Sequence, residues 1–452
     1  MAKKAKKLHT KKGLELKVVN PNAAGIDIAD TEMQVCVPVE KDGENNRRFG
    51  SFTQDLDQIC DWLTHCGITT AAMEATGVYW IPLFFKLKAA GIDVVLVNAR
   101  DVKNIAEKKT DEADAEWIML LHSYGLLKSS FQPENEARQV RNLARQRNNL
   151  LRTASKEIQH MQKAMEQMNI KLSTVLSDIV GKSGQAIIEA ILSGERNPKT
   201  LASLADRRCK RSREEIEKSL EGTWSEDHLF ELKQASNLYS FIMNQVADCD
   251  AEIERMLQKY TATLDTSKMN LIRSKKTIAS KNVVHMDVEA YAHALWGINP
   301  MSIPGMSVNS ILQLMGELGH NFTDKFDSAS KFCKWCNIVP YTKISGGKLI
   351  SSRLPKRKNP VGQIFRMCAN TVRNSKDEMG FYFRRIKSRG GHAQAIVATA
   401  HKIAKIFYMM VKQQCAYDPS RVGEDEQELL RRKIARAERA LEALNAKLSL
   451  SA

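Results

Sequence analysis

Four acidic residues in three short stretches have the chemistry of a metal site. Asp27 lies in GIDIAD, Glu74 in AMEATG, and Asp111 and Asp114 in KKTDEADAEW. Carboxylate oxygens are the hard ligands that Mg²⁺ and Mn²⁺ prefer, and Asp27 interrupts an apolar run, where a charge is costly unless it is paired or bound to metal. Asp111 and Asp114 are three residues apart, which places them on one face of a helix. The pattern predicts that the four acids hold Mg²⁺ or Mn²⁺ over a nucleic-acid phosphate.

A second group of reactive residues surrounds Ser345, in KISGGKLISSR. Gly346 and Gly347 allow positive φ and a close approach of the backbone to a ligand. Neighbouring cations would stabilise the charge that develops when the hydroxyl attacks a phosphodiester, a role for which we name Lys348 and Arg353. The residues alone favour a plainer alternative, a flexible turn that binds phosphate through its amides. Ser351 and Ser352 are weaker candidates for the nucleophile.

The elements that must position the acids alternate between strands and helices. Residues 21–128 are predicted to form an α/β domain with one sheet flanked by helices. Glu74 closes a predicted strand, at the edge where sites of α/β sheets collect. The predicted strands are 24–38, 48–52, 69–74 and 93–98, and the predicted helices are 56–65, 80–90 and 112–125.

Residues 129–275 are predicted to be helical, with the apolar spacing of a coiled coil that pairs subunits. Arg147 falls on the apolar seam and weakens it. Arg141 and Arg145 belong to a basic face that either meets phosphate or is simply solvated. A second basic cluster, at residues 207–213, is a candidate for contact with nucleic acid. No motif identifies the role of residues 172–224.

Residues 276–416 are predicted to form a mostly helical unit, and residues 417–452 a further helix. Pro304 and Gly305 precede an amphipathic helix, as in half of a helix-hairpin-helix. Residues 341–376 contain no acid and nine bases, which indicates a phosphate backbone nearby. These bases are Lys343, Lys348, Arg353, Lys356, Arg357, Lys358, Arg366, Arg373 and Lys376.

The composition also indicates a polyanionic partner. The formal net charge is +16 and the first twelve residues carry six lysines and no acid, so residues 1–20 are predicted to be a disordered basic tail. We expect no membrane segment, because no run of eighteen apolar residues occurs. The nine cysteines are scattered and odd in number, as expected of reduced cytoplasmic thiols.

The acidic and serine motifs, in this order, resemble those of the DEDD transposases of the insertion-sequence one-ten family, including its eleven-eleven branch. The resemblance covers nearly the whole chain. In the first half it rests on GIDIAD, MEATGVYW, LVNARDVKN and KKTDEADAEWI, and in the second half on SIPGMS, GELG, FCKWCNIVPYTKISGGKLISSR and AIVATAHKIAKIFY.

The resemblance implies an N-terminal domain with an RNase H-like fold similar to RuvC, whose four metal-binding acids match Asp27, Glu74, Asp111 and Asp114. It also implies a C-terminal transposase domain whose serine nucleophile matches Ser345. The implied reaction is strand exchange through a covalent serine–DNA link, at a composite site formed by different subunits of a dimer or tetramer. The implied partners are donor and target double-stranded DNA and an element-encoded guide RNA, in the bacterial cytoplasm at the nucleoid.

Two alternatives of other classes remain open from the residues. A metal-dependent nuclease or junction resolvase that hydrolyses with water would need the acids and not Ser345. A non-catalytic nucleic-acid-binding protein would need only the basic surface, and neutralising its acids would leave binding intact or tighter.

Overall fold

The structure is a computed structural model, and the chain divides into two units, residues 1–132 and residues 133–452. Arg357, most of the predicted basic tail and most of the predicted C-terminal helix lie outside the described residues. The residues that the structure describes are 17–98, 111–262, 264, 273–274, 282–356, 358–422, 431, 434–435, 437–439 and 441–442.

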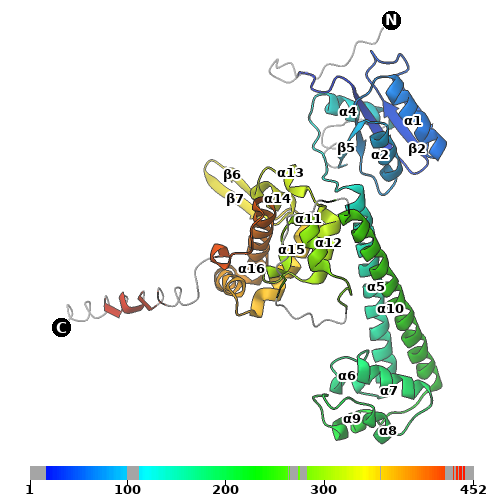
Figure 1. The fold of residues 1–452 in the computed structure, drawn as a ribbon, viewed down its shortest axis with the longest axis vertical. Helices are drawn as coiled ribbons and strands as arrows, with labels where there is room; N and C mark the ends of the chain where they lie inside the picture. Colours follow the sequence, from blue (N-terminus) through cyan, green and yellow to red (C-terminus); the bar gives the residue numbers. More distant parts are fainter. Residues whose placement is uncertain are drawn as a thin grey trace. The chain divides into compact units, whose positions relative to one another are not determined.

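The first unit is built on a five-stranded sheet in the order β3-β2-β1-β4-β5 (Figure 1). Strand β2 is antiparallel to both of its neighbours, β1 and β3, whereas β4 and β5 run parallel to β1. This mixed sheet confirms the α/β class predicted for the first domain. The strands are β1 (Ala23–Ile28), β2 (Glu32–Cys36), β3 (Asn46–Gly50), β4 (Thr70–Glu74) and β5 (Asp93–Val97).

Helices cover both faces of this sheet. One face carries Ile26, Met73 and Leu96, which are buried in a single core with apolar residues of α1 (Thr53–His65) and α2 (Trp80–Ala89). The opposite face is covered by α4 (Asp111–Ser123), whose residues pack in small clusters against it. Side chains alternate between the faces of a strand, so the position of a residue along the strand decides which helix it meets.

The prediction of one strand over residues 24–38 was wrong. The run is two strands, β1 and β2, which pair as an antiparallel hairpin. The break falls at Ala29, whose amide donates to the Glu32 carbonyl at 3.0 Å. The apolar alternation continues on both sides of the turn, which is why the pattern alone did not show it.

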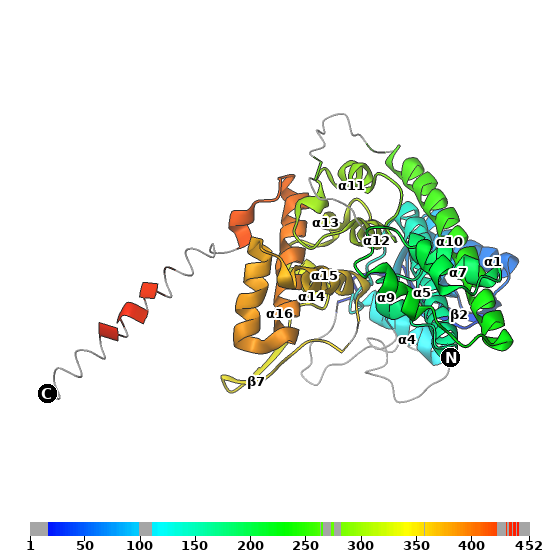
Figure 2. The same ribbon diagram turned by 90° about the horizontal axis from the view of Figure 1, so that it is seen from below.

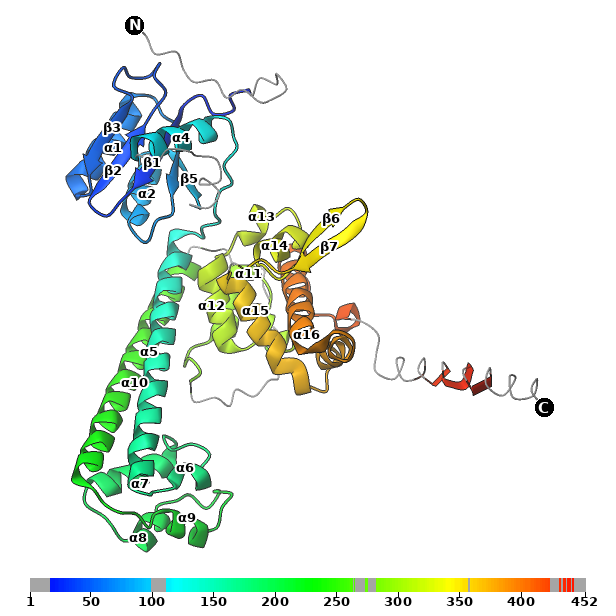
Figure 3. The same ribbon diagram turned by 180° about the vertical axis from the view of Figure 1, so that it is seen from behind.

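The second unit begins with a long helical hairpin made of α5 (Asn135–Gln167) and α10 (Glu226–Thr261) (Figure 3). The seam predicted to pair subunits packs instead against α10 of the same chain. Residues buried on α10 have the matching heptad spacing, among them Tyr239, Ile242, Val246 and Ile253. Periodicity reveals that a helix has a partner, but it does not reveal which helix that partner is.

Arg147 on the α5 seam is buried and forms an ion pair with Asp250 of α10. Its Nη2 also donates to an Asp250 oxygen and to the Asn282 carbonyl, each at 3.1 Å. We expect Arg147→Met to destabilise the hairpin by about 3–5 kcal/mol, because it leaves a buried carboxylate unpaired. Adding Asp250→Leu should restore most of that stability, as measured by hydrogen exchange of α5 and α10 peptides. A double variant no more stable than the single one would contradict this account.

Four short helices gather at the far end of the hairpin, between α5 and α10 (Figure 3). They enclose their own core with residues of both long helices, including Met165, Ile187, Leu201 and Ile216. We call residues 171–224 the end subdomain. Its helices are α6 (Leu172–Val175), α7 (Lys182–Leu192), α8 (Pro198–Ser203) and α9 (Arg213–Ser219).

The rest of the second unit is a helical bundle with one projecting β-hairpin (Figure 2). Its aromatic core includes Trp296, Phe322, Phe332 and Phe407. None of the described helices is apolar over a long enough stretch to cross a bilayer. The elements are α11 (Val288–Trp296), η1 (Pro300–Ser302), α12 (Val308–Leu318), α13 (Phe322–Lys325), α14 (Ala329–Trp335), β6 (Tyr341–Ser345), β7 (Lys348–Arg353), α15 (Pro360–Thr371), η2 (Val372–Asn374), α16 (Glu378–Gln413) and η3 (Pro419–Val422).

Candidate functional site

Asp27 and Glu74 lie side by side on the two central parallel strands of the first unit. Ile26 pairs with Met73, so the next residues of the two strands are neighbours. Both acids are half-buried. Because Asp27 is two residues after Gly25, it shares the face of the sheet that α4 covers.

Three contacts fix the direction of α4 across this face. At its last turn, His122 Nε2 is 2.8 Å from Thr70 Oγ1, at the start of β4. In its middle, the backbone of Ala115 and Met119 crosses directly over Gly25. The first turn of α4, with Asp111 and Asp114, therefore lies toward the strand ends that carry Asp27 and Glu74.

The rises of strand and helix agree with this placement. Thr70 to Glu74 spans about 13 Å of strand, at roughly 3.3 Å per residue. His122 to Asp114 spans about 12 Å of helix, at roughly 1.5 Å per residue. Asp114 is thus level with Glu74, and the positive end of the helix dipole favours carboxylates in this turn.

Asp27 and Glu74 each accept a hydrogen bond from a residue close in the sequence. The Ile28 amide donates to Asp27 at 3.1 Å, and the Thr76 hydroxyl donates to Glu74 at 3.0 Å. Asp114 is half-buried, whereas the side chain of Asp111 and residues 99–110 lie outside the description. Within the described part of the chain, no three His, Cys, Asp or Glu side chains converge closely enough to hold a metal ion.

Gly25 is a structural requirement of the site that sequence reasoning missed. A Cβ on Gly25 would lie 2.2 Å from the Met119 backbone nitrogen and 2.3 Å from the Ala115 carbonyl oxygen. A glycine within a strand signals such a close approach. Only a residue without a side chain allows α4 to lie this close to β1.

We expect Gly25→Ala to destabilise the first unit by about 2–3 kcal/mol, because the backbone of α4 must move away from the sheet. Hydrogen exchange of β1 and α4 peptides would measure the loss. Gly43→Ala is the matched control, because a Cβ there meets nothing within 4 Å. Equal exchange in the two variants would show that α4 is not seated on Gly25.

His122 makes the seating of α4 sensitive to acid. Its ring is buried, and burial lowers its pKa from the ordinary 6.5 although Asp93 opposes the shift. Below pH 6.5 the ring takes up a proton in the unfolded chain but resists it in the folded one. The free energy of unfolding therefore decreases as the pH is lowered. The expected slope is at most about 1.4 kcal/mol per pH unit. The protection factors of α4 peptides, which correct for the slower intrinsic exchange in acid, should fall from about pH 7 to pH 5 in the wild type and less in His122→Gln.

Ser345 is the last residue of β6, at the tip of an exposed two-stranded hairpin. It pairs with Lys348 across Gly346 and Gly347. Both glycines have positive φ, 54° and 75°, as the favoured two-residue hairpin turn requires. The positive φ predicted for these glycines is confirmed, and the turn holds the serine beside a lysine in solvent.

An irregularity in the hairpin separates its cations from its apolar residues. Lys343 pairs with Ser351 but Ile344 pairs with Leu349, so Ile350 is an extra residue of β7. The bulge places Ile344, Leu349 and Ile350 on one face, where each is more than 60% exposed. The opposite face, which we call the serine face, carries Tyr341, Lys343, Ser345, Lys348, Ser351 and Arg353.

The other predicted nucleic-acid contacts differ in their surroundings. Lys356 and Lys358 are exposed beyond the end of β7. Arg145 forms an ion pair with Glu317 of α12 at 2.6 Å, and Arg141 lies 4.0 Å from the same carboxylate. The side chain of Arg141 is only 15% exposed. These arginines of α5 therefore also join the α5–α10 helical hairpin to the helical bundle.

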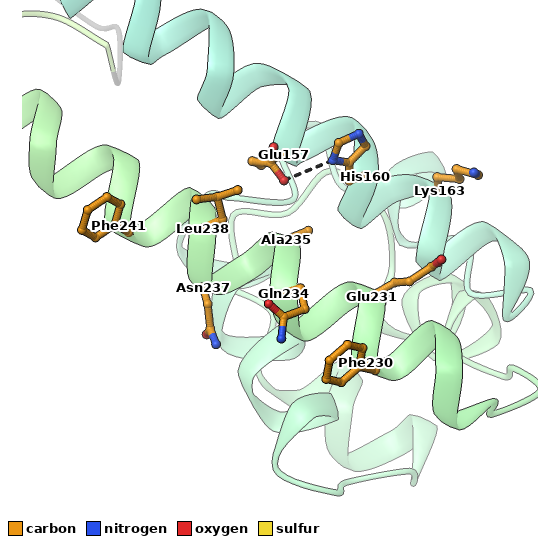
Figure 4. A pocket seen from close by; sticks show the side chains of 10 residues that line it. All are labelled: Glu157, His160, Lys163, Phe230, Glu231, Gln234, Ala235, Asn237, Leu238 and Phe241. Atoms are coloured by element: carbon orange, nitrogen blue, oxygen red, sulfur yellow. Dashed lines mark hydrogen bonds and ion pairs between the residues drawn. The ribbon is translucent and has the colours of Figure 1, made fainter.

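A hollow of about 590 Å³ lies between α5 and α10 near the end subdomain (Figure 4). It contains none of the predicted site residues. His160 Nδ1 lies 3.1 Å from Glu157 Oε2 at its wall, and Phe230, Leu238 and Phe241 are exposed around it. A histidine–glutamate hydrogen bond beside exposed apolar side chains gives this hollow no evident chemistry.

Two family models match the parts of the chain that contain the two groups of residues. Residues 24–170, which contain all four acids, match a family model of DEDD transposases of the IS110 type. Residues 300–383, which contain Ser345 and the basic stretch around it, match the model of transposases of the IS116/IS110/IS902 family. No curated protein matches the chain. The two family matches together cover about half of the 452 residues, and the chain belongs to the IS110 family of transposases.

Proposed function

We propose that this transposase exchanges DNA strands through a covalent link between Ser345 and DNA. The observation that carries the proposal is the serine face of the β6–β7 hairpin. It presents the Ser345 hydroxyl at the turn, with Lys343, Lys348 and Arg353 on the same side. A phosphodiester on this face would meet a nucleophile and several positive charges together.

The four acids are the second part of the proposed site. Their donors are all carboxylate oxygens, which fit Mg²⁺ or Mn²⁺. Asp27 and Glu74 are neighbours near the carboxyl ends of β1 and β4, and the first turn of α4 is directed toward the same ends. Asp27, Glu74, Asp111 and Asp114 would hold the ion, which supplies Lewis-acid stabilisation of a phosphate oxygen. The mixed sheet with helices on both faces supports an RNase H-like, RuvC-like fold for this unit.

The serine step conserves the energy of the broken bond. The Ser345 oxygen bonds to phosphorus, the phosphorus–deoxyribose oxygen bond breaks, and the hydroxyl proton is balanced by the one that the leaving oxygen gains. Lys343, Lys348 and Arg353 would stabilise the extra charge of the pentacovalent phosphorus. Attack by a second DNA end on the serine ester then reseals the strand without ATP.

The partners form the rest of the proposal. The net charge of +16 suits an assembly with several polyanions. In this proposal an element-encoded guide RNA recognises donor and target double-stranded DNA by base pairing. The protein contacts the nucleic-acid backbone and recognises its shape. The acids and the serine would come from different subunits of a dimer or tetramer.

The products of a reconstituted reaction test this proposal. Purified protein, the element-encoded RNA, Mg²⁺ and two labelled DNA duplexes should give recombinant duplexes with rejoined strands. Omitting the RNA or chelating Mg²⁺ should remove them. Cleaved ends that never rejoin would instead favour a nuclease or junction resolvase that hydrolyses with water.

A further inference from the structure

The end subdomain, residues 171–224, lies outside both ranges matched by the transposase models. Its most polar feature is the loop that joins α8 to α9. Five of the seven residues from 207 to 213 are basic, and all five are exposed. We call this segment, residues 206–213, the basic loop.

The basic loop is held at both ends. At its start, the Asp206 amide donates to Ser183 Oγ of α7 at 2.9 Å, and the Asp206 carboxylate accepts from the Arg208 amide at 3.0 Å. At its end, Ser212 caps α9 and exchanges hydrogen bonds with Glu215. These bonds fix the backbone, so binding a ligand would cost little ordering of the loop.

Most of the charge on the loop is available to a partner. Arg208 pairs with Asp206 at 3.1 Å, and Arg211 pairs with Glu215 at 3.4 Å, both at the surface. Arg207, Lys210 and Arg213 have no ion-pair partner among the described residues. Exposed pairs contribute little energy, so even the paired arginines can turn toward a stronger anion.

The loop lines two hollows of about 600 and 410 Å³. The larger one is lined by Lys182, Arg208, Lys210, Arg211 and several hydroxyls, with Asp178 and Asp206 as its acids. The smaller one is lined by Arg207, Arg211 and Arg213, with Asp206 as its acid. No aromatic side chain lines either hollow. Single-stranded bases are usually held by aromatic stacking, so the surface fits a backbone rather than unstacked bases.

We propose that the basic loop binds the phosphate backbone of a double helix, as a contact surface separate from the β6–β7 hairpin. Cations on a fixed loop meet successive phosphates, and serine hydroxyls in the larger hollow can donate to phosphate or sugar oxygens. RNA and DNA duplexes share this chemistry. The proposal goes beyond strand exchange and does not depend on it.

Equilibrium binding of the full-length protein to double-stranded RNA, double-stranded DNA and single-stranded RNA, across a range of salt, tests the proposal. In the triple variant Arg207→Gln/Lys210→Gln/Arg213→Gln, the slope of log affinity against log salt should fall by about 2–3, at roughly 0.9 per lost phosphate contact. The loss should appear with a duplex. A loss with RNA alone or DNA alone identifies the duplex, and equal losses indicate backbone recognition of both.

The matched control is Lys199→Gln/Lys218→Gln/Lys233→Gln. These three lysines are exposed, lie in or beside the end subdomain and line neither hollow. The control removes the same charge, so it separates a local contact from a general loss of attraction. Equal salt slopes in the two triple variants, or a loss confined to single-stranded RNA, would overturn the proposal. Neither result bears on the serine chemistry, because strand exchange is not measured.

Discussion

Replacing Ser345 with alanine is expected to abolish recombination, with a loss on the order of 10⁴-fold or more, because the nucleophile has no substitute in the bond-making step. DNA binding should be nearly unchanged, since the hydroxyl carries no charge and the hairpin pairing does not use it. Recombinant products and DNA affinity, measured on the same preparation, would separate the two effects.

The other serines of the hairpin are natural controls. Ser352 pairs with Thr342 on the apolar side, so Ser352→Ala should recombine like the wild type. Ser351 lies on the serine face opposite Lys343. If Ser351→Ala were inactive while Ser345→Ala recombined, the nucleophile would have been assigned to the wrong hydroxyl.

Neutralising a single acid of the first unit is the second change with a large expected effect. Asp27→Asn, Glu74→Gln and Asp114→Asn should each reduce recombination on the order of 10²–10⁴-fold, because each removes a charged ligand from the proposed cation site. DNA affinity should stay the same or rise, since a negative charge is lost. Mg²⁺ titration of the residual activity should show a higher metal requirement.

Asp61→Asn is the matched control for the acids. Asp61 is exposed on α1, which covers the opposite face of the sheet. The Asp61→Asn variant loses the same charge from the same unit, and its recombination should equal that of the wild type. Full activity in any of the three site variants would mean that its carboxylate holds no essential ion.

The parts of the fold that local patterns specify were predicted from the sequence. The predicted strand ending at Glu74 corresponds to β4, and the predicted helix over residues 112–125 corresponds to α4. The period of the apolar residues, two in a strand and 3.6 in a helix, can be recognised even in such short segments. Gly346 and Gly347 indicated a turn, because two adjacent glycines readily adopt two positive φ values. The five-part division of the chain stays a prediction.

What the sequence did not show depends on contacts between distant residues. The partner of the α5 seam is α10, about a hundred residues away, as the pair Arg147–Asp250 illustrates. The bulge at Ile350 follows from strand register, which decides the side of the hairpin on which Arg353 lies. The direction of α4 over Gly25 required Thr70 and His122 to be seen together.

The covalent link is the central claim, and trapping it is the most direct test. Protein, guide RNA, Mg²⁺ and end-labelled DNA would be mixed and denatured, and labelled protein would be digested for peptide mass spectrometry. We predict a DNA-linked peptide containing Ser345 in the wild type, present in Ser352→Ala and absent from Ser345→Ala. Cleaved DNA without any linked peptide, in wild type and Ser345→Ala alike, would contradict it.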